Sequence, residues 1–503
     1  MGASSDAAEI NLDFVSKLAK ARAQKPFRSP RADMPDVLKQ DNLNYDKYRE
    51  IEFRHEKALW LGDGLPYRVE FFHPGYLYQE PVQVNEFTLT HVQSIRFVQD
   101  FFNYRSLDIA KKIPTKTGYA GFKLLNELNE NERWDEIGAF LGASYFRLLG
   151  KGQRYGLSAR GLAIDCGETD RGEEFPIFTD WWLGKPHRED SDLRMYAILD
   201  SVSCVGAYSF LIHPGESTAT DIETVLFVRT PDMIKPVDPQ RKPIKTLGIA
   251  PLTSMFWFGK NTERKPEDYR LEAHDSDGLL MHLDKGEVLW RPLNNPPVMR
   301  HQRFGTKNLR GFGLMQRERD FAAYQDLFNY YHNVPSVWVE PRGNWGEGDI
   351  HLVELPTNYE GLDNVVAFWD PKTKPAPMEP FRMSYTLFWT RENDMKLSPN
   401  KTVATRIGAH PRDALSRQIM IDFRGPKLDN IPENAPPVPV ASCSENGAIT
   451  EAQIFKNTAA GGWRVFLRMK PNVGNVDPID LRCTLVSAEE NVSETWTYHW
   501  SPP

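Results

Sequence analysis

Short stretches in which apolar and polar residues alternate recur along most of the chain and predict half-buried β-strands. They begin with YREIEFRHEKALW (48–60), YRVEFFH (67–73) and VQVNEFTL (82–89). Strand-like stretches return later as LAID (162–165), YAILDSVS (196–203), YSFLIHP (208–214), TVLFVRT (224–230), HLVEL (351–355) and VVAFW (365–369). They do not alternate with helical patterns, which disfavours a parallel sheet with crossover helices. The pattern predicts an all-β fold dominated by a large antiparallel β-sandwich.

Two segments depart from the strand pattern. Residues 7–24 predict a short amphipathic helix, because apolar residues recur there at helical spacing. These residues are Ile10, Phe14, Leu18 and Ala21, and Asp6 is the candidate N-cap before them. Residues 119–149 are predicted to be an insertion with helical character.

The strand pattern also divides the chain. Residues 391–415 are polar and poor in strand pattern, which predicts a linker region between a large sandwich domain at 1–390 and a smaller domain at 416–503. About seven short strands in the last 100 residues or so are typical of a small immunoglobulin-like sandwich. They include QIMIDFRG (418–425), PPVPVASCSE (436–445), ITEAQIFKN (449–457), WRVFLRMKP (463–471), DLRCTLVSA (480–488) and TWTYHWSP (495–502).

Composition narrows the function classes. The chain has 503 residues, a formal net charge of -7, 40% hydrophobic residues and 26% charged residues. Such values are normal for a globular protein and lack the basic surplus of a nucleic-acid binder. No apolar run approaches the roughly 18 residues of a membrane span. The 13 Trp, 18 Tyr and 28 Phe are the unusual feature. They indicate either a carbohydrate groove or large β-sheets, which enrich the same residues.

The N-terminus and the cysteines leave the compartment open. MGASSDAAEINLDF shows no signal peptide, so the protein is cytoplasmic or its leader has been removed or left out. The four cysteines lack CxxC spacing, which argues against a zinc site. Cys443 and Cys483 could pair with each other, and free buried thiols are an equal alternative.

Two isolated aspartates are the candidate catalytic residues. Asp275 lies in HDSDGL (274–279) and Asp363 in GLDNVVAFW (361–369). On residue type alone each is better explained as a turn residue. The ligand pattern of a calcium loop, the nucleotide-binding loops and the H-E-x-x-H metal motif are all absent. Carboxylate chemistry on an aromatic-rich β scaffold remains, and cleavage of a glycosidic bond by two acids is the leading case.

Several long strings resemble one family. The chain is similar to the osmoregulated periplasmic glucan biosynthesis proteins, the glucan G/D family, from about residue 8 to about residue 500. The strings are FFHPGYLYQEPVQVNEF (71–87), YFRLLGKGQRYGLSARGLAIDCG (145–167), EEFPIFTDWWL (173–183), PLTSMFWFG (251–259), HDSDGL (274–279), WRPLNNP (290–296), GFGLMQRERDF (311–321) and SETWTYHW (493–500). The resemblance implies a large N-terminal β-sandwich like galactose mutarotase and a small C-terminal immunoglobulin-like sandwich.

The resemblance also implies a periplasmic protein whose leader has been removed. The branch, G or D, stays open. Members of the family resemble inverting glycoside hydrolases that act on β-1,2-glucan, the backbone of osmoregulated periplasmic glucans. The resemblance implies no cofactor and no metal. It also implies no nucleic-acid partner and no membrane-spanning segment. The oligomeric state is not fixed: a homodimer and a contact with the membrane glucan synthase both remain open.

The resemblance reverses the interpretation of the two aspartates. Their strings match family motifs, so we expect Asp363 as the acid and Asp275 as the base. Six further residues are predicted to bind sugar, with less support than the two aspartates. For each of them, a structural role in the core or on the surface is an equal alternative. These candidates are Trp181, Trp182, Tyr331, Trp345, Arg291 and Arg310.

One segment departs from the family pattern. Many relatives carry a more polar run before the second aspartate, whereas here it is TNYEGLDN (357–364). Fewer polar groups could alter the proton path or reduce water access, so transglycosylation competes with hydrolysis. The alternative from another class is a non-catalytic periplasmic scaffold that binds glucan and assists its export or branching.

Overall fold

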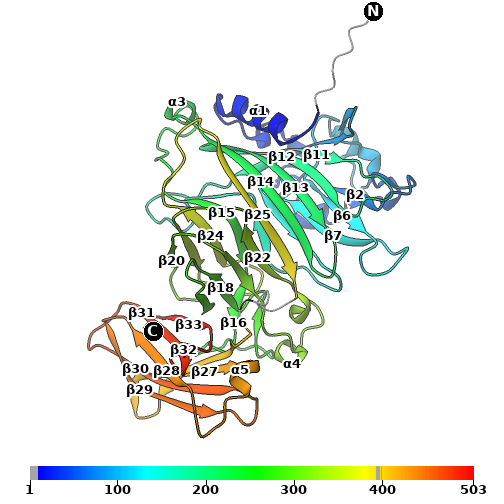
Figure 1. Cartoon of the computed structure of the whole chain (residues 1–503). Helices are drawn as coiled ribbons and strands as arrows, with labels where there is room; N and C mark the ends of the chain where they lie inside the picture. Colours follow the sequence, from blue (N-terminus) through cyan, green and yellow to red (C-terminus); the bar gives the residue numbers. More distant parts are fainter. Residues whose placement is uncertain (1–8, 392–396, 398, 503) are drawn as a thin grey trace, which may run out of the picture. The chain divides into compact units, whose positions relative to one another are not determined.

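The computed structural model of the chain describes residues 9–391, 397 and 399–502. Most regular structure is β-strand, arranged in several sheets (Figure 1). This confirms the prediction of an all-β sandwich fold. The chain forms two compact units. The first unit comprises Met1–Pro251, Pro341–Trp345 and Phe368–Trp389, and the second comprises Leu252–Glu340, Gly346–Ala367 and Thr390–Pro503.

The first unit contains two sheets, with strand orders β25-β14-β13-β12-β11-β3-β4 and β2-β6-β7-β8-β9. Its strands are β1 (Glu52–Phe53), β2 (Tyr67–Phe72), β3 (Gln83–Phe87), β4 (Val92–Ile95), β5 (Phe102–Asn103), β6 (Gly121–Asn126), β7 (Asp135–Leu141), β8 (Tyr145–Leu148), β9 (Ser158–Arg160), β10 (Ala163–Ile164), β11 (Ile177–Gly184), β12 (Leu193–Asp200), β13 (Cys204–His213), β14 (Thr218–Val228), β15 (Leu247–Ser254) and β25 (Phe381–Thr390). Its helices are α1 (Leu12–Ala23), α2 (Tyr45–Tyr48), α3 (Pro231–Ile234), η1 (Pro30–Asp33), η2 (Asp36–Leu38), η3 (His55–Lys57), η4 (Gln99–Phe101) and η5 (Ala110–Lys112).

Aromatic side chains fill the space between these two sheets. The ring of Trp181 on β11 lies 5.2 Å from that of Phe122 on β6 and 5.0 Å from that of Phe140 on β7. Both contacts have the edge-on geometry that aromatic pairs prefer. Trp181 is only 1% exposed. The first unit is therefore a sandwich whose core is built on stacked and edge-on aromatic rings.

The predicted N-terminal helix is present as α1. Asn11 is its N-cap, and the side-chain oxygen of Asn11 accepts a hydrogen bond from the N–H of Phe14 at 2.9 Å. Asp6, the predicted cap, lies outside the described residues. Helix α1 lies against β12, β13 and β14 (Figure 1). Val15 and Ala19 of α1 are fully buried in the core cluster that it shares with these strands. The helix thus covers a sheet face that would otherwise expose apolar side chains.

The prediction of helical character at 119–149 was wrong. This segment forms β6, β7 and β8, which pair antiparallel in sequence order. Its polar stretch, ELNENERW (127–134), contains helix formers but connects β6 to β7. Glu132 in this connection has a φ of 63°, which interrupts a helix. Pairing with β2 outweighed the local preference for helix.

The second unit contains strands in the orders β28-β31-β33-β19-β18-β21-β22, β24-β23-β20, β16-β17 and β26-β27-β30-β29. Of β24, only Val365–Ala367 belong to this unit. Its strands are β16 (Phe256–Phe258), β17 (Ala273–His274), β18 (Gly278–His282), β19 (Val288–Pro292), β20 (Arg300–Thr306), β21 (Gly311–Met315), β22 (Ser336–Pro341), β23 (Gly348–Glu354), β24 (Val365–Pro371), β26 (Lys401–His410), β27 (Asp413–Arg424), β28 (Val438–Cys443), β29 (Gly447–Lys456), β30 (Trp463–Pro471), β31 (Ile479–Ser487), β32 (Glu490–Asn491) and β33 (Thr495–Trp500). Its helices are α4 (Phe321–Tyr324), α5 (Pro426–Asp429) and η6 (Tyr331–Asn333).

Strand structure reaches into the predicted linker. Lys401–His410 is β26 and Asp413–Arg424 is β27, whereas residues 392–396 and 398 of the predicted linker lie outside the described residues. In the second unit β33 also pairs parallel with β19, with Trp290 opposite Trp496. The range 416–503 therefore shares a sheet with strands from 278–292. The division into domains at 1–390 and 416–503, and the immunoglobulin-like character of the second, stay predictions.

The four cysteines lie among the described residues, and their thiols are free. Cys443 on β28 faces Leu481 in the strand register, whereas Cys483 on β31 faces Ala441. The two cysteines are thus offset along neighbouring strands. Burial raises the pKa of the Cys483 thiol to about 12, so it is protonated near neutral pH.

Within residues 9–391, 397 and 399–502, no helix combines the length and the apolar character that crossing a membrane requires.

Candidate functional site

Asp275 lies in the short turn between β17 and β18, in the second unit. The Asp-Ser-Asp-Gly sequence suits such a turn, because short polar side chains and glycine favour tight reversals. The N–H of Asp275 donates to the carbonyl of Met255 at 2.9 Å. Asp275 itself is half-buried. The chain bends at Asp275 and at Asp277, and the main-chain bond to Met255 fixes Asp275 just after β17.

Asp363 lies in the loop between β23 and β24, also in the second unit, and is exposed. The next residue, Asn364, is 2% exposed and anchors this loop. The side chain of Asn364 accepts a hydrogen bond from the N–H of Phe256 at 2.8 Å and donates to the carbonyls of Phe256 at 3.0 Å and Leu355 at 2.9 Å. The backbone next to Asp363 is thus fixed while its carboxylate reaches the surface.

One peptide group joins the two aspartate segments. In the peptide group between Met255 and Phe256, the carbonyl oxygen of Met255 accepts the N–H of Asp275. The N–H of Phe256 in the same group donates to the side-chain oxygen of Asn364. Because both hydrogen bonds end on the same peptide group, the segment that carries Asp275 and the loop that carries Asp363 flank this peptide group on its two sides. The backbone at Asp275 and the side chain of Asn364, the neighbour of Asp363, are therefore attached to one peptide group. The pairing of the two carboxylates stays a prediction.

Tyr331, at the start of η6, lies between these segments. Its hydroxyl donates to the carboxylate of Glu360 at 2.7 Å, and Glu360 belongs to the same loop as Asp363. Burial, the negative charge of Asp275 and the bond to Glu360 raise the pKa of the Tyr331 hydroxyl far above its ordinary value. Tyr331 therefore keeps its proton at physiological pH and donates it to Glu360, so its hydroxyl oxygen is left to accept a further hydrogen bond.

A buried arginine organises the acidic groups around Tyr331. Arg270 forms ion pairs with Asp268 at 2.9 Å, Asp326 at 2.9 Å and Glu360 at 2.6 Å. Its guanidinium carbon also lies 6.0 Å or less from the ring centres of Trp257, Tyr269 and Tyr331. Sequence reasoning missed Arg270 and Glu360, because they pair with each other across 90 residues and no motif surrounds them.

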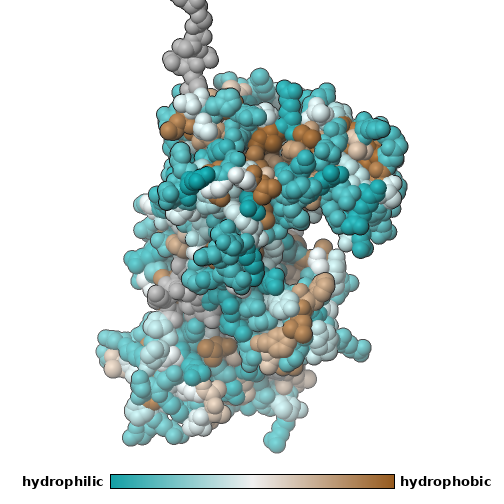
Figure 2. Space-filling model, turned by 90° about the vertical axis from the view of Figure 1, so that its right-hand side faces the viewer, coloured by the Kyte–Doolittle hydropathy of each residue, from teal (hydrophilic) through white to brown (hydrophobic). Residues whose placement is uncertain are grey.

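Aromatic side chains next to this cluster are exposed. Hydrophobic residues reach the surface in small groups on the face drawn in Figure 2. Near Arg270, Tyr269 is 73% exposed and Tyr359 is 49% exposed. Phe328, whose N–H donates to Asp326, is 91% exposed. A sugar chain presents apolar C–H faces and hydroxyl groups. Exposed rings beside polar groups offer a surface that can contact both.

The other predicted sugar-binding residues lie elsewhere. Trp181, Trp182 and Trp345 are in the first unit and are buried, the last with its indole N–H donated to the carbonyl of Ser384 at 3.0 Å. Arg291 is fully buried in the second unit, paired with Glu354 at 3.1 Å. Arg310 is exposed near His282 and lowers the pKa of that histidine, after the larger effect of burial. These placements suit the core and surface alternatives, and the sugar-binding roles of all five stay predictions.

Among the residues that the structure describes, no cluster of three or more His, Cys, Asp or Glu side chains has an arrangement suited to a metal ion.

Replacing Asn364 by Ala should loosen the loop that carries Asp363. The change leaves the Phe256 peptide group without its side-chain partner, and an unsatisfied buried polar group costs about 1–3 kcal/mol. We expect the free energy of unfolding to fall by about that amount in a denaturant titration. The matched control is Asn358→Ala, an exposed asparagine of the same loop, which should leave stability unchanged. Equal stability of the two variants would contradict the anchoring role.

Comparison with known proteins finds matches over nearly the whole chain. The family described as "Periplasmic glucan biosynthesis protein, MdoG" matches residues 10–500. One relative, "Glucans biosynthesis protein G" of Ralstonia nicotianae, is 42% identical over 503 residues. The match covers 98% of this chain and 96% of that relative.

Proposed function

The chain belongs to the family of periplasmic glucan biosynthesis proteins, and from this premise we propose that it cleaves or transfers β-1,2-linked glucan with Asp363 and Asp275 as an acid–base pair. The observation that carries the proposal is the Met255–Phe256 peptide group, which holds the segments of both aspartates. Two carboxyl groups placed on either side of a bond are what glycosidic cleavage requires.

In the proposed reaction Asp363 is the acid and Asp275 the base. The acid protonates the leaving oxygen of the glycosidic bond, and the base takes a proton from the attacking hydroxyl. The attack comes from the opposite face of the sugar and inverts the anomeric centre. Proton transfer through a sugar hydroxyl or a water fits this scheme, so neither carboxylate has to touch the scissile bond.

Tyr331 supports this scheme as a neutral hydroxyl whose oxygen can accept a further hydrogen bond. Its hydroxyl is bound to Glu360, and its high pKa is due to burial and then to the charge of Asp275. A neutral hydroxyl beside a carboxylate can fix a sugar hydroxyl or a water in the proton path. The exposed rings of Tyr269, Phe328 and Tyr359 supply stacking surface for successive glucose units.

The loop TNYEGLDN bears on the identity of the attacking hydroxyl. A side chain at Gly361 would approach the ring of Tyr359 to 2.4 Å, so glycine lets this ring fold back over its own loop. Tyr359 and Leu362 are each 49% exposed, which gives the loop before Asp363 an apolar surface. An apolar surface disfavours water relative to a sugar chain. This supports transglycosylation as a competitor of hydrolysis.

Incubation of the purified protein with linear β-1,2-glucan tests the proposal, with products resolved by size and by anomeric form. Shorter linear products with inverted anomers would support hydrolysis. Products with new linkages or closed rings would support transglycosylation. Glucan binding without any product would overturn the enzymatic proposal and favour the scaffold.

Tyr331→Phe should lower the turnover rate about 10–100-fold while the protein stays folded. A hydrogen bond to a charged group contributes about 1.5–3 kcal/mol, and about 1.4 kcal/mol corresponds to tenfold in rate. Steady-state kinetics on linear β-1,2-glucan measures the effect. Tyr330→Phe, at the preceding residue, is the matched control and should retain the wild-type rate. Unchanged turnover in Tyr331→Phe would remove the hydroxyl from the scheme.

A further inference from the structure

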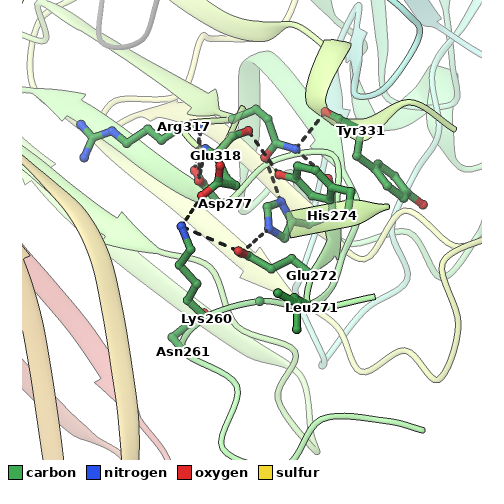
Figure 3. A network of polar contacts seen from close by, with 12 residues as sticks. Lys260, Asn261, Leu271, Glu272, His274, Asp277, Arg317, Glu318 and Tyr331 are labelled. Atoms are coloured by element: carbon green, nitrogen blue, oxygen red, sulfur yellow. Dashed lines mark hydrogen bonds and ion pairs between the residues drawn. The ribbon is translucent and has the colours of Figure 1, made fainter. Parts of the chain in front are cut away.

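A buried chain of polar side chains lies next to the Asp275 turn, in the second unit. Figure 3 shows Lys260, Glu272 and His274 joined by dashed contacts in this network. Lys260 is 3.7 Å from the carboxylate of Glu272, which lies 3.1 Å from Nε2 of His274. Nδ1 of His274 lies 2.8 Å from the side-chain oxygen of Gln316. Glu272 is 4% exposed, and His274 and Gln316 are fully buried.

The hydrogen-bond pattern fixes the protons on His274. The amide nitrogen of Gln316 donates to the main-chain carbonyls of His274 at 2.8 Å and Tyr331 at 3.3 Å. The amide oxygen of Gln316 therefore faces Nδ1, and an amide oxygen only accepts. The carboxylate of Glu272 likewise accepts from Nε2. Both ring nitrogens consequently donate, which requires a positively charged imidazolium.

The charges around the ring agree with this assignment. Burial alone would lower the pKa of His274, but the bond to Glu272 and the charges of Glu272 and Asp277 raise it above its ordinary value of 6.5. The carboxylate of Asp277 accepts the N–H groups of Arg317 and Glu318. Two cations, Lys260 and His274, thus face three carboxylates, which are Glu272, Asp277 and Glu318.

The remaining neighbours of the ring add little positive charge. Phe256 of β16 stacks on it at 5.4 Å, and Tyr324 of α4 meets it edge-on at 5.4 Å. The guanidinium of Arg317, on the chain after β21, is paired with Glu494 at 2.8 Å and lies 3.5 Å from the ring centre of Trp290. A cavity of about 40 Å³ borders His274, Glu272 and Lys260. It can hold a few water molecules, which gives the ring proton a polar route.

The position of Gln316 connects this network to the site. One amide group binds the carbonyl of the residue before Asp275 and the carbonyl of Tyr331. The orientation of that amide depends on the Nδ1 proton of His274. If the ring becomes neutral, the proton that remains is held by the carboxylate of Glu272, because charge-assisted hydrogen bonds are the stronger ones. Nδ1 then presents a lone pair to the amide oxygen, and the amide loses its fixed orientation.

We propose that the imidazolium of His274 is a positioning group that, through Gln316, fixes Asp275 and Tyr331 for glucan turnover, and that turnover falls as rising pH removes the ring proton. This inference rests on the proposed function. The group acts through Gln316 and does not touch the substrate. The pKa of His274 is raised above 6.5, so the ring is charged and positions the site at low pH. Turnover is therefore lost on the alkaline side, above pH 6.5, where the ring gives up its proton.

The test compares the pH dependence of turnover with direct titration of the ring. Turnover of linear β-1,2-glucan by wild type and Glu272→Gln is measured across the pH range. The ring protonation is followed by ¹⁵N NMR of histidine-labelled protein, and the His274 signal is identified by its shift in Glu272→Gln. In wild type we expect both ring nitrogens protonated at pH 7, and an alkaline loss of turnover whose midpoint coincides with the NMR titration.

Glu272→Gln is nearly isosteric and removes the charge that holds the ring proton. Both midpoints should move down by about 1–3 pH units, since a close opposite charge shifts a pKa by that amount. Glu340→Gln, an exposed glutamate of β22, is the matched control and should move neither. A neutral ring at pH 7, or an alkaline limb that stays in place in Glu272→Gln, would overturn the inference. Absence of turnover in wild type at every pH would overturn the proposed function, and this inference with it.

Discussion

Turnover of β-1,2-glucan should fall about 10²–10⁴-fold when Asp363 is replaced by Asn, and by a similar factor in Asp275→Asn. General acid–base catalysis contributes rate factors of this size, and an amide can neither give nor take the proton. The exposed position of Asp363 and the anchoring of the turn at Asp275 by its main chain mean that neither change should unfold the protein. Product analysis by size and anomeric form measures the rate, and an isotherm with the same glucan measures binding.

The control is Asp284→Asn in the turn between β18 and β19, which should keep the wild-type rate. Binding of glucan should persist in both aspartate variants, because the exposed rings of Tyr269, Phe328 and Tyr359 remain. If either variant turns over glucan at the rate of the control, that aspartate is not part of the acid–base pair. Loss of binding together with turnover would instead assign the aspartates to substrate recognition.

Trp181→Ala should lower the free energy of unfolding by about 3–5 kcal/mol, the range for truncating a large aromatic residue in a core. The ring is 1% exposed and contacts Phe122, Phe140, Phe178 and Phe210, so its loss opens a cavity between the two sheets of the first unit. Denaturant unfolding measures the change. Trp134→Ala, in the same unit but partly exposed, should cost much less.

The same position decides between two roles predicted for Trp181. Trp181→Phe keeps an aromatic ring in the core and should fold. Its affinity for β-1,2-glucan should equal that of wild type if the ring serves only packing. A clear loss of affinity in this folded variant would restore the sugar-binding role.

Much of the fold could be predicted because alternation of apolar and polar residues reports directly on half-buried strands. The prediction failed at 119–149, where a polar connection rich in helix formers joins strands whose pairing partners lie elsewhere in the chain. At 391–415 the polar composition hid the strand β26, which is only partly buried. Pairing between distant strands decided both cases, and local patterns do not contain it.

Only part of the candidate site could be predicted from the sequence, for a similar reason. The residue types around Asp275 indicate a turn, and only the resemblance to a family singled out this turn and Asp363. Tyr331 was one of several aromatic candidates without a distinguishing signal. Arg270, Glu360 and Asn364 matter through contacts with residues distant in sequence, and Gln316 acts through two main-chain carbonyls. Such links become visible only when the folded chain brings their partners together.

The parallel pairing of β33 with β19 has a consequence for how the second unit folds. β33 lies between β19 and β31 in its sheet, although it is the last strand of the described chain. The sheet that includes the strand following Asp275 therefore stays incomplete until the final strand has been synthesised. Contacts this distant in sequence slow folding, because a long loop must close first. Loss of the last strand through a premature stop should consequently disable a site whose residues all lie far upstream.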